Sequence, residues 1–336
     1  MKRKIIVTNI PAFYKIKMYN EVNKYVKLTV IFTDYNASDR NEDFVNGAMN
    51  FHCEFLNGTV KQKIVQAVSI VKKSAYDELI LGGWDHPVLW ALAFIFPKNK
   101  NSIFIESSYF ESQTNGIKGI IKRFFISRIN KVYASGKSQK KITDALGFKG
   151  ETVITKGVGV FNFVSQPTYI ERPTIKNFIY VGRFVEVKNL AFLINVFNSL
   201  PQYNLYLVGF GEQEEYLKSI ALDNIVFMGA IDNSKLSSVY QQMDVFVLPS
   251  KVEPWGLVVE EALNNGLPVL VSNRVGCAEE IIDDSNGLIF QYDSKEDLLR
   301  ALTEISKVDF YNSLRRNISH LNFEEIEDKQ IKCYIQ

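Results

Sequence analysis

Cysteine, histidine and tryptophan are scarce in this sequence of 336 residues, which holds three of each. The cysteines, Cys53, Cys277 and Cys333, are far apart, odd in number and without metal-ligand spacing, so we expect reduced thiols. The histidines are equally scattered, and no Asp-x-Asp motif occurs. Because zinc sites need clustered ligands and a metal-bound diphosphate needs carboxylates, we expect no metal.

Long apolar runs are also absent, and none reaches the roughly 18–20 residues that a membrane span needs. The N-terminus, MKRKIIVTNIP, lacks a small-residue cleavage site, so it predicts a first strand and not a signal peptide. With 46% apolar residues and a mean hydropathy of -0.05, the chain has core material for a cytoplasmic globular protein. Its length predicts two domains of roughly 150 residues each.

Charge is distributed unevenly along the chain. Residues 1–165 contain 24 Lys or Arg against 13 Asp or Glu, whereas residues 166–336 contain 15 against 24. A basic first half joined to an acidic second half predicts different partners for each.

Short runs rich in Ile, Val, Phe and Tyr alternate with helical patterns along the whole chain. Nearly continuous apolar runs are typical of parallel strands that are buried on both faces. The expected strands lie at 4–10, 26–33, 78–83, 101–107, 131–135, 152–157, 177–182, 203–209, 224–230, 245–250, 268–273 and 287–290. The expected helices of the second half lie at 188–199, 212–221, 234–243, 256–265 and 294–306, the last with a Ser-x-x-Asp start signal at Ser294.

This alternation occurs twice, which predicts an α/β protein with two doubly wound, Rossmann-like domains. The stretch 161–176, with two prolines, is the expected linker. We place the first domain at 1–165, the second at 166–310, and a C-terminal helix at 311–336 that packs back toward the first domain. Because ligands of such sheets bind beyond the carboxyl ends of the strands, the expected site is the cleft between the facing domains.

The first motif with chemistry is VGRFVEVKNL, where an expected strand ends at Gly182. Arg183 follows directly, and Lys188 opens the next helix. Two cations at one strand end could hold a diphosphate; two solvated surface cations are the alternative.

Two further strand ends carry glycines. Gly209 and Gly211 lie between a strand and a helix, where they permit a tight turn, although turn chemistry alone explains them equally well. The next strand ends with Phe227, Met228 and Gly229, whose main chain could pair with the edge of a base; a simple strand terminus is the alternative.

The stretch EPWGLVVEEALNNGLPVLVS places two glutamates around an expected helix start. Gly256 and Leu257 begin that helix, whose unpaired N–H groups and positive dipole end suit a phosphate. Glu261, one turn in, could accept hydrogen bonds from a ribose diol, and Glu253 in the preceding loop could bind sugar hydroxyls. We expect Glu260 to be an ordinary surface charge.

Together these loops resemble the retaining GT-B glycosyltransferases of family 4, the type that builds bacterial surface polysaccharides. The resemblance rests on the E-x7-E pair in EPWGLVVEE and on VGRFVEVKN, LVGFGE, VFMG and VFVLPSKVEPWG, in this order. It covers about 176 to 300; the first half agrees only in general layout, as expected for a domain that binds a variable acceptor. The implied fold is GT-B, two Rossmann-like domains facing across a cleft.

The resemblance also implies roles for individual residues. Arg183 and Lys188 would neutralise the donor diphosphate, Glu261 would hold the ribose hydroxyls, and Glu253 the donor sugar. The remaining donor contacts would come from Gly182, Gly209, Phe227, Met228, Gly229, Pro254, Trp255, Gly256 and Leu257.

The sequence departs from the family pattern in three places. Where many members have a histidine near the reacting centre, this chain has Glu106, which either positions the acceptor equivalently or leaves its hydroxyl to be held differently. Asn9 to Phe13 replace a glycine pair common after the first strand, and only Gly276 remains of a Gly-Gly-x-x-Glu turn.

The segment from Ser112 to Thr143 has no acidic residue and eight Lys or Arg. Such a helix could lie on anionic lipid, where each cation contributes about 1 kcal/mol; a core-facing helix with a solvated basic face is the alternative. Without a nucleic-acid-binding motif, we expect no nucleic acid partner. The apolar residues at near-helical spacing within it are Ile117, Ile120, Ile121, Phe124 and Ile129.

The resemblance thus implies a metal-independent, retaining hexosyltransferase on the inner face of the plasma membrane. It would move a sugar from a UDP- or GDP-sugar, a substrate and not a cofactor, to a lipid-linked or oligosaccharide acceptor in O-antigen, capsule or lipooligosaccharide synthesis. One alternative is a nucleotide-sugar 2-epimerase of the same architecture, which would need acid/base side chains in the cleft. The other is a nucleotide-sugar-binding protein without catalysis.

Overall fold

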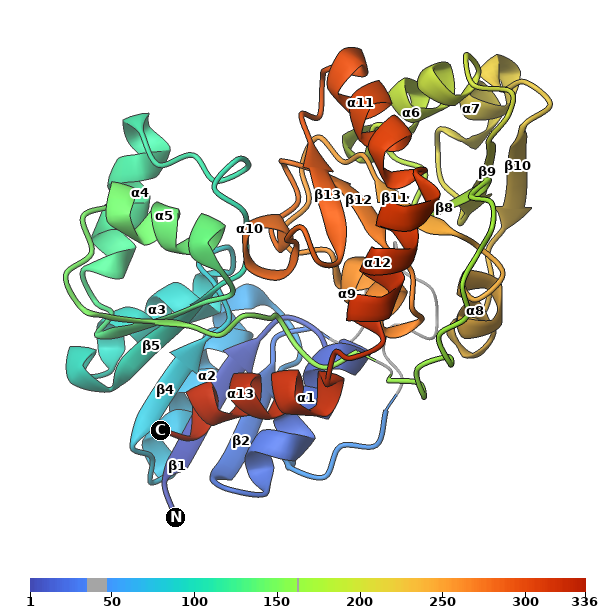
Figure 1. Ribbon diagram of the computed structural model, residues 1–336. Helices are drawn as coiled ribbons and strands as arrows, with labels where there is room; N and C mark the ends of the chain where they lie inside the picture. Colours follow the sequence, from blue (N-terminus) through green and yellow to red (C-terminus); the bar gives the residue numbers. More distant parts are fainter. Residues whose placement is uncertain (35–46, 162) are drawn as a thin grey trace. The chain divides into compact units, whose positions relative to one another are not determined.

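The computed structural model describes residues 1–34, 47–161 and 163–336, and the chain divides into two compact units (Figure 1). The first unit comprises Met1–Phe161 and Glu324–Gln336, and the second comprises Asn162–Phe323.

The first unit contains a seven-stranded parallel sheet with the strand order β3-β2-β1-β4-β5-β6-β7. Six of the strands are those predicted. The additional strand is β3 at one edge, whose pattern is half-exposed and contains a glutamate. The strands are β1 (Arg3–Thr8), β2 (Lys27–Phe32), β3 (His52–Phe55), β4 (Glu78–Leu81), β5 (Asn101–Ile105), β6 (Lys131–Ala134) and β7 (Glu151–Ile154).

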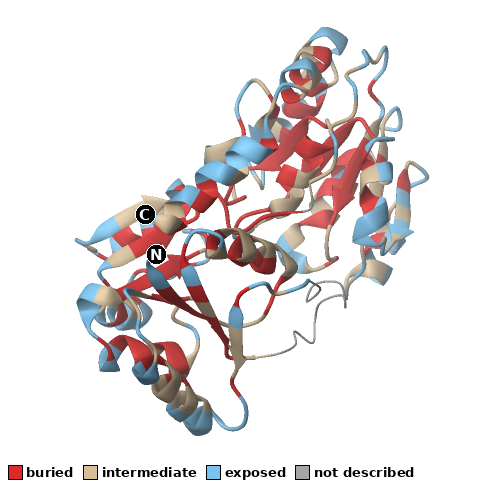
Figure 2. Ribbon diagram, turned by 90° about the horizontal axis from the view of Figure 1, so that it is seen from below, coloured by how far each residue is buried: buried red, intermediate tan, exposed pale blue. Residues whose placement is uncertain are grey.

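Helices cover both faces of this sheet, because alternate side chains of each strand point to opposite sides. Ile5 and Val7 of β1 pack into a core formed with α2, α3, α4 and α5. The inner strands are buried while the outer faces of the helices are exposed (Figure 2). The helices are α1 (Phe13–Asn23), α2 (Val60–Lys73), α3 (Pro87–Ile95), η2 (Lys98–Lys100), α4 (Gly116–Ile126), α5 (Lys137–Ala145) and α13 (Phe323–Ile335).

The last helix, α13, completes the first unit (Figure 1). Its Tyr334 ring lies 5.8 Å from that of Phe104 on β5 and 5.3 Å from that of Tyr133 on β6. At the end of the chain, the main-chain oxygen of Gln336 accepts a 3.4 Å hydrogen bond from buried Lys4 on β1. The C-terminus is therefore fixed to the middle of the sheet.

The second unit contains a six-stranded parallel sheet with the order β10-β9-β8-β11-β12-β13. Every strand predicted for this half is present: β8 (Asn177–Val181), β9 (Asn204–Val208), β10 (Ile225–Gly229), β11 (Val245–Leu248), β12 (Val269–Ser272) and β13 (Gly287–Phe290). β8 and β11 are neighbours, so the loops that follow them leave the sheet side by side.

The five helices predicted between 188 and 306 are present in the second unit, although the one at 188–199 begins later than expected. There a 3-10 turn is followed by Asn189 in the left-handed conformation (φ 60°), and the α-helix starts only at Leu190. The start signal at Ser294 is confirmed, because its side chain accepts a 3.1 Å hydrogen bond from the amide of Asp297. The helices are η3 (Glu186–Lys188), α6 (Leu190–Phe197), α7 (Glu214–Ile220), α8 (Asn233–Tyr240), α9 (Leu257–Asn264), α10 (Ala278–Ile281), α11 (Lys295–Ile305) and α12 (Val308–Ile318).

A buried carboxylate fixes the entry into this sheet. Asp244, 3% exposed, accepts 2.9 Å hydrogen bonds from the amides of Lys176 and Asn177 and from the guanidinium of Arg172. A buried charge is tolerated when all its acceptors are satisfied in this way. Within the described ranges, none of the helices has the length and apolar character needed to cross a membrane.

Candidate functional site

The carboxyl ends of β8, β11, β12 and β13 are linked by hydrogen bonds between the loops that follow them. The amide of Lys251 donates to the carbonyl of Val187 at 2.8 Å, which joins the β11 loop to the β8 loop. The side chain of Asn189 donates to the carbonyl of Tyr292 at 2.9 Å, and so joins the β8 loop to the end of β13. These links position the side chains that carry the predicted chemistry.

Lys188 and Glu253 form an ion pair, although 65 residues separate them. Their side chains are 16% and 12% exposed, so the pair is largely shielded but reachable from solvent. Sequence reasoning assigned Lys188 to the diphosphate and Glu253 to the sugar; the structure joins the two. A pair at this point can present a cation and a carboxylate to adjacent parts of one ligand.

Arg183 adds a second cation directly after β8. Its carbonyl accepts a 2.9 Å hydrogen bond from the buried hydroxyl of Tyr180, which fixes the main chain here. Among the described residues, no carboxylate forms an ion pair with its half-buried guanidinium. Burial raises the pKa of the Tyr180 hydroxyl, with a smaller contribution from Glu253, so Tyr180 remains a neutral donor.

The loop that carries Glu253 is held by the turn after β12. The amide of Glu253 donates to the carbonyl of Arg274 at 3.2 Å, and the amide of Gly276 donates back to the carbonyl of Glu253 at 2.9 Å. Glu253 and Val275 form an isolated parallel bridge. The single glycine that remains of the family's Gly-Gly-x-x-Glu turn thus supports the main chain of Glu253.

Gly256 forms the N-cap of α9 and has a left-handed conformation (φ 104°). Because glycine has no side chain, no side-chain oxygen of the cap accepts a hydrogen bond from the first amides of the helix. These amides lie at the positive end of the helix dipole. Space is also limited, since a Cβ at Gly256 would lie 3.0 Å from Cγ1 of Val275. The start of α9 is therefore suited to an anion.

Replacing Gly256 by alanine should destabilise the second unit by about 1–3 kcal/mol, because the left-handed conformation disfavours a Cβ. It should also weaken nucleotide binding, since the displaced loop carries the first amides of α9. Urea unfolding and nucleotide titration would measure both effects. The matched control is Gly147→Ala in the first unit, also left-handed (φ 72°) but in open space. Gly147→Ala should lose stability but keep its nucleotide affinity. If Gly256→Ala also kept its nucleotide affinity, the assignment of an anion site to the start of α9 would be contradicted.

Glu260 is buried and not the surface charge that the sequence suggested, being 6% exposed. Its carboxyl accepts a 2.9 Å hydrogen bond from the indole Nε1 of Trp255, itself 2% exposed. Burial raises the pKa of Glu260 to about 8; the bond from Trp255 lowers it, and nearby Glu261 raises it slightly. A neutral carboxyl thus anchors the tryptophan between Pro254 and Gly256.

Glu261 lies on the next position of α9 and is half-buried. Its carbonyl accepts hydrogen bonds from the amide and the side chain of Asn265, at 3.1 and 2.8 Å, which closes the end of the helix. Pro254 is exposed at the loop tip. The E-x7-E pair therefore stands on a loop and helix that are fixed at both ends.

Gly209 brings the β9 loop against the β8 loop. A Cβ at Gly209 would lie 1.9 Å from the carbonyl oxygen of Gly182, so only glycine fits here. Its amide donates a 2.8 Å hydrogen bond to the carbonyl of Gly229. That carbonyl, one of the main-chain groups predicted to contact the base, thus already has a partner within the protein. The ring of Phe227 lies 6.1 Å from that of Phe184 in an edge-to-face arrangement, beside half-exposed Met228.

Glu106 lies in the first unit, directly after β5, and so apart in the chain from the other predicted site residues. It pairs with Lys15 of α1, a residue that sequence reasoning missed. The Lys15 ammonium is buried and lies 5.1 Å from the ring centre of Phe104. The position that replaces the family's histidine is thus a partly exposed carboxylate paired with a buried lysine.

No group of three or more His, Cys, Asp or Glu side chains is placed to hold a metal ion in the described parts of the chain. Metal independence stays a prediction. The three cysteines are free thiols, as expected.

Comparisons with known proteins agree on the second half of the chain. Residues 168–320 match the family described as Glycosyl transferases group 1. The sulfoquinovosyl transferase SQD2 of Arabidopsis thaliana is 36% identical over 118 residues, 35% of this chain and 22% of that protein. The O-antigen biosynthesis glycosyltransferase WbnH of Escherichia coli is 30% identical over 200 residues, 58% of this chain and 56% of that protein. The chain thus matches less than two thirds of the length of either relative.

Solved structures match over nearly the whole length. The sucrose-phosphate synthase of Thermosynechococcus elongatus has a TM-score of 0.73 at 17% identity and covers 99% of this chain and 98% of its own. The lipopolysaccharide outer core galactosyltransferase WaaB has a TM-score of 0.72 at 15% identity, covering 98% of both chains. At such identities the likeness concerns the fold. The chain is therefore an α/β protein of the GT-B architecture, and its residues 168–320 are similar to the glycosyl transferases group 1 family.

Proposed function

We propose that this protein is a retaining, metal-independent glycosyltransferase that uses a nucleotide-sugar donor. Its acceptor is a lipid-linked or oligosaccharide chain in bacterial surface polysaccharide synthesis, and it works at the cytoplasmic face of the membrane. The family match and the relatives in O-antigen and lipopolysaccharide core synthesis support a glycosyltransferase. A fold neighbour from Anabaena, HepE, was solved with UDP and glucose, at a TM-score of 0.69 and 15% identity. That neighbour supports a nucleotide-sugar donor here.

One observation carries the proposal: the Lys188–Glu253 pair lies in the same set of linked loops as Arg183 and the uncapped start of α9. Two cations and a helix N-terminus suit a diphosphate, and the carboxylate suits the hydroxyls of the sugar attached to it. Glu261 is assigned to the ribose, and the strand end at Phe227 to Gly229 to the base.

In the proposed reaction the acceptor hydroxyl oxygen bonds to the anomeric carbon while the bond from that carbon to the diphosphate oxygen breaks. The leaving diphosphate takes the hydroxyl proton, so no separate base is required. Lys188, Arg183 and the amides of α9 stabilise the charge that develops on the diphosphate, a preorganised electrostatic effect. Attack on the same face as the leaving group retains the configuration.

Titration with UDP, GDP and their sugar conjugates tests the donor assignment. A nucleotide that binds only the folded protein stabilises it by RT ln(1 + [L]/Kd), about 2.7 kcal/mol at a hundredfold excess over Kd. We expect one of the two bases to raise the melting temperature of the wild type and to lose this effect in Arg183→Ala. Failure of both nucleotides to stabilise the wild type would refute the assignment of this site.

Incubation of that donor with candidate acceptors, in the presence of EDTA, then tests the activity. Transfer with an unchanged anomeric configuration in the NMR spectrum of the product is the expected result. Interconversion of the donor without an acceptor would indicate an epimerase instead, and binding without turnover a protein that only holds nucleotide sugars.

A further inference from the structure

One face of α4 in the first unit is apolar and exposed. Four residues at helical spacing form it, and their exposed fractions are 78% for Ile117, 63% for Ile120, 48% for Ile121 and 60% for Phe124. The opposite face of the same helix, with Phe125, is buried in the core. The helix is therefore apolar on two sides, and packing within the unit uses only one of them.

The end of α3 extends this surface. Phe94 and Ile95 are 36% and 51% exposed, and the rings of Phe94 and Phe124 are 4.7 Å apart. The guanidinium of Arg128 lies 5.6 Å from the ring centre of Phe94. We call Phe94, Ile95, Ile117, Ile120, Ile121 and Phe124 the α3–α4 apolar patch.

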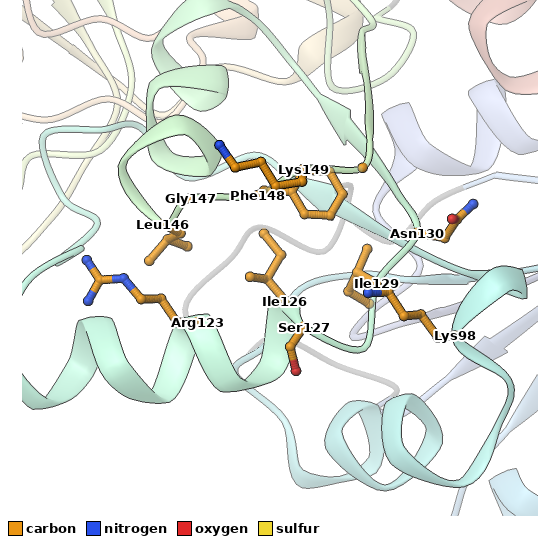
Figure 3. Close-up of a pocket in the computed structure, with 11 residues that line it drawn as sticks. Lys98, Arg123, Ile126, Ser127, Ile129, Asn130, Leu146, Gly147, Phe148 and Lys149 are labelled. Carbon is orange, nitrogen blue, oxygen red and sulfur yellow. The ribbon is translucent and has the colours of Figure 1, made fainter.

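A basic pocket with a volume of about 380 Å³ lies at the C-terminal end of α4, the helix that carries most of the patch (Figure 3). Lys98, Arg123 and Lys149 line it, from η2, α4 and the loop before β7. No acidic residue occurs in the sequence at 87–105 or at 112–143. The two segments that carry the patch therefore contain cations and no carboxylates.

The structure narrows the basic segment expected from the sequence. Ile129 is 1% exposed and belongs to the core, so it is not part of the exposed face. Lys131 pairs with Glu151 at 3.1 Å, and Lys140 pairs with Asp144 at 2.8 Å. Of the eight cations, Lys118, Lys122 and Arg123 lie on α4, and Arg128 follows it directly.

We propose that the α3–α4 apolar patch inserts into the interfacial layer of an anionic membrane and that the basic pocket binds a lipid phosphate. Aliphatic and aromatic side chains flanked by Lys and Arg suit that layer, since the apolar groups enter it while the cations meet headgroups. A second copy of the chain would bring two basic faces together, and nucleic acid would not use four exposed Ile and Phe side chains. This inference rests on the proposed function, which places the enzyme at the cytoplasmic face of the membrane, and deepens it by naming the surface that binds there.

Flotation of the full-length protein with vesicles tests the inference. Wild type should bind vesicles of phosphatidylcholine with 30% phosphatidylglycerol, less so at high salt, and should bind pure phosphatidylcholine vesicles at least about tenfold more weakly. Ile117→Asp should lower binding at least about tenfold, because a charge then enters the interfacial layer. Its matched control is Ile170→Asp in the second unit, where Ile170 is 69% exposed. This control should bind within about twofold of wild type.

A second pair of variants tests the pocket. Lys98→Ala with Lys149→Ala should weaken binding to the anionic vesicles, whereas Lys72→Ala with Lys73→Ala, which removes the same charge from α2, should not. An equal loss of vesicle binding in the two double variants would show that general charge attraction explains the binding, and would overturn the pocket assignment. Equal binding of Ile117→Asp and wild type, or wild-type dimers that Ile117→Asp dissociates, would overturn the membrane assignment.

Nucleotide titration of the same variants separates this inference from the proposed function. We expect Ile117→Asp to be stabilised by the nucleotide as wild type is, but not to float with the vesicles. If wild type floated with the vesicles but bound no nucleotide, the donor site would be refuted while the membrane-binding surface would still be supported.

Discussion

Lys188→Ala should lower kcat/KM for sugar transfer by about 10²–10³-fold, the usual cost of removing one preorganised group that stabilises developing charge. Lys188 pairs with Glu253 in a largely shielded position, and on donor binding its ammonium would also meet the departing diphosphate. Because the charge on that diphosphate grows in the transition state, we expect kcat to fall more than the affinity for the nucleotide.

The two members of the pair should behave differently when each is replaced. Glu253→Ala frees the Lys188 ammonium, so the free nucleoside diphosphate should bind at least as tightly as in wild type while transfer is lost. Lys188→Ala should weaken the binding of the same nucleotide. Calorimetric titration of both variants distinguishes these outcomes. Equal loss of nucleotide affinity in both would contradict the separate roles.

A lysine in the same linked loops serves as the control. Lys251 pairs with Glu186 at 3.2 Å, with side chains 40% and 76% exposed, and only its main-chain amide supports the site. Lys251→Ala should therefore leave kcat/KM within about twofold of wild type, since exposed ion pairs contribute little. A defect as large as that of Lys188→Ala would show that net charge near the site, and not the position of Lys188, determines the rate.

The fold could be predicted because the strands are buried on both faces and so leave long apolar runs. β3 escaped prediction since it lies at an edge and is only half-buried. The meeting of Lys188 and Glu253 follows from the adjacency of β8 and β11, which the strand order decides and sequence spacing does not.

Buried ionisable side chains were the features that the sequence did not reveal. Glu260 stands beside Glu261 in a helix, and nothing in that pattern indicates that one glutamate turns inward. Its partner, the indole of Trp255, lies five residues earlier and was expected to contact the donor. Likewise, nothing in the sequence around Lys15 indicates that it is buried and paired with Glu106, 91 residues away.

Glu260 should make the stability of the second unit depend on pH. Its pKa is raised from the model-peptide value of 4.5 to about 8, chiefly by burial, so the native state keeps a proton that the unfolded chain loses. The groups that face it are the Trp255 indole, the Glu261 carboxylate and the Cys277 thiol, whose own pKa burial raises. Stability from this group is thus complete at low pH and is lost as the pH rises toward 8.

Replacing Glu260 by glutamine should remove that dependence, because an amide oxygen still accepts the bond from Trp255 but carries no charge. Each pH unit between about 4.5 and about 8 lowers the free energy of unfolding of wild type by about 1.4 kcal/mol. The difference in this free energy between wild type and the glutamine variant should therefore change by up to about 5 kcal/mol over that range. The shift favours the glutamine variant at high pH, and the two should be nearly equal at pH 5.

Urea unfolding at several pH values measures this difference in the free energy of unfolding. The ¹⁹F NMR signal of 5-fluorotryptophan at Trp255, the tryptophan of the second unit, monitors the unfolding. Glu212→Gln, at an exposed glutamate of that unit, is the control and should track wild type at every pH. If the variant and wild type lost stability in parallel from pH 5 to 8, Glu260 would be ionised in the native state. Its bond to the indole would then be that of a carboxylate, and the loop that carries Glu253 would be anchored by a buried charge instead of a neutral group.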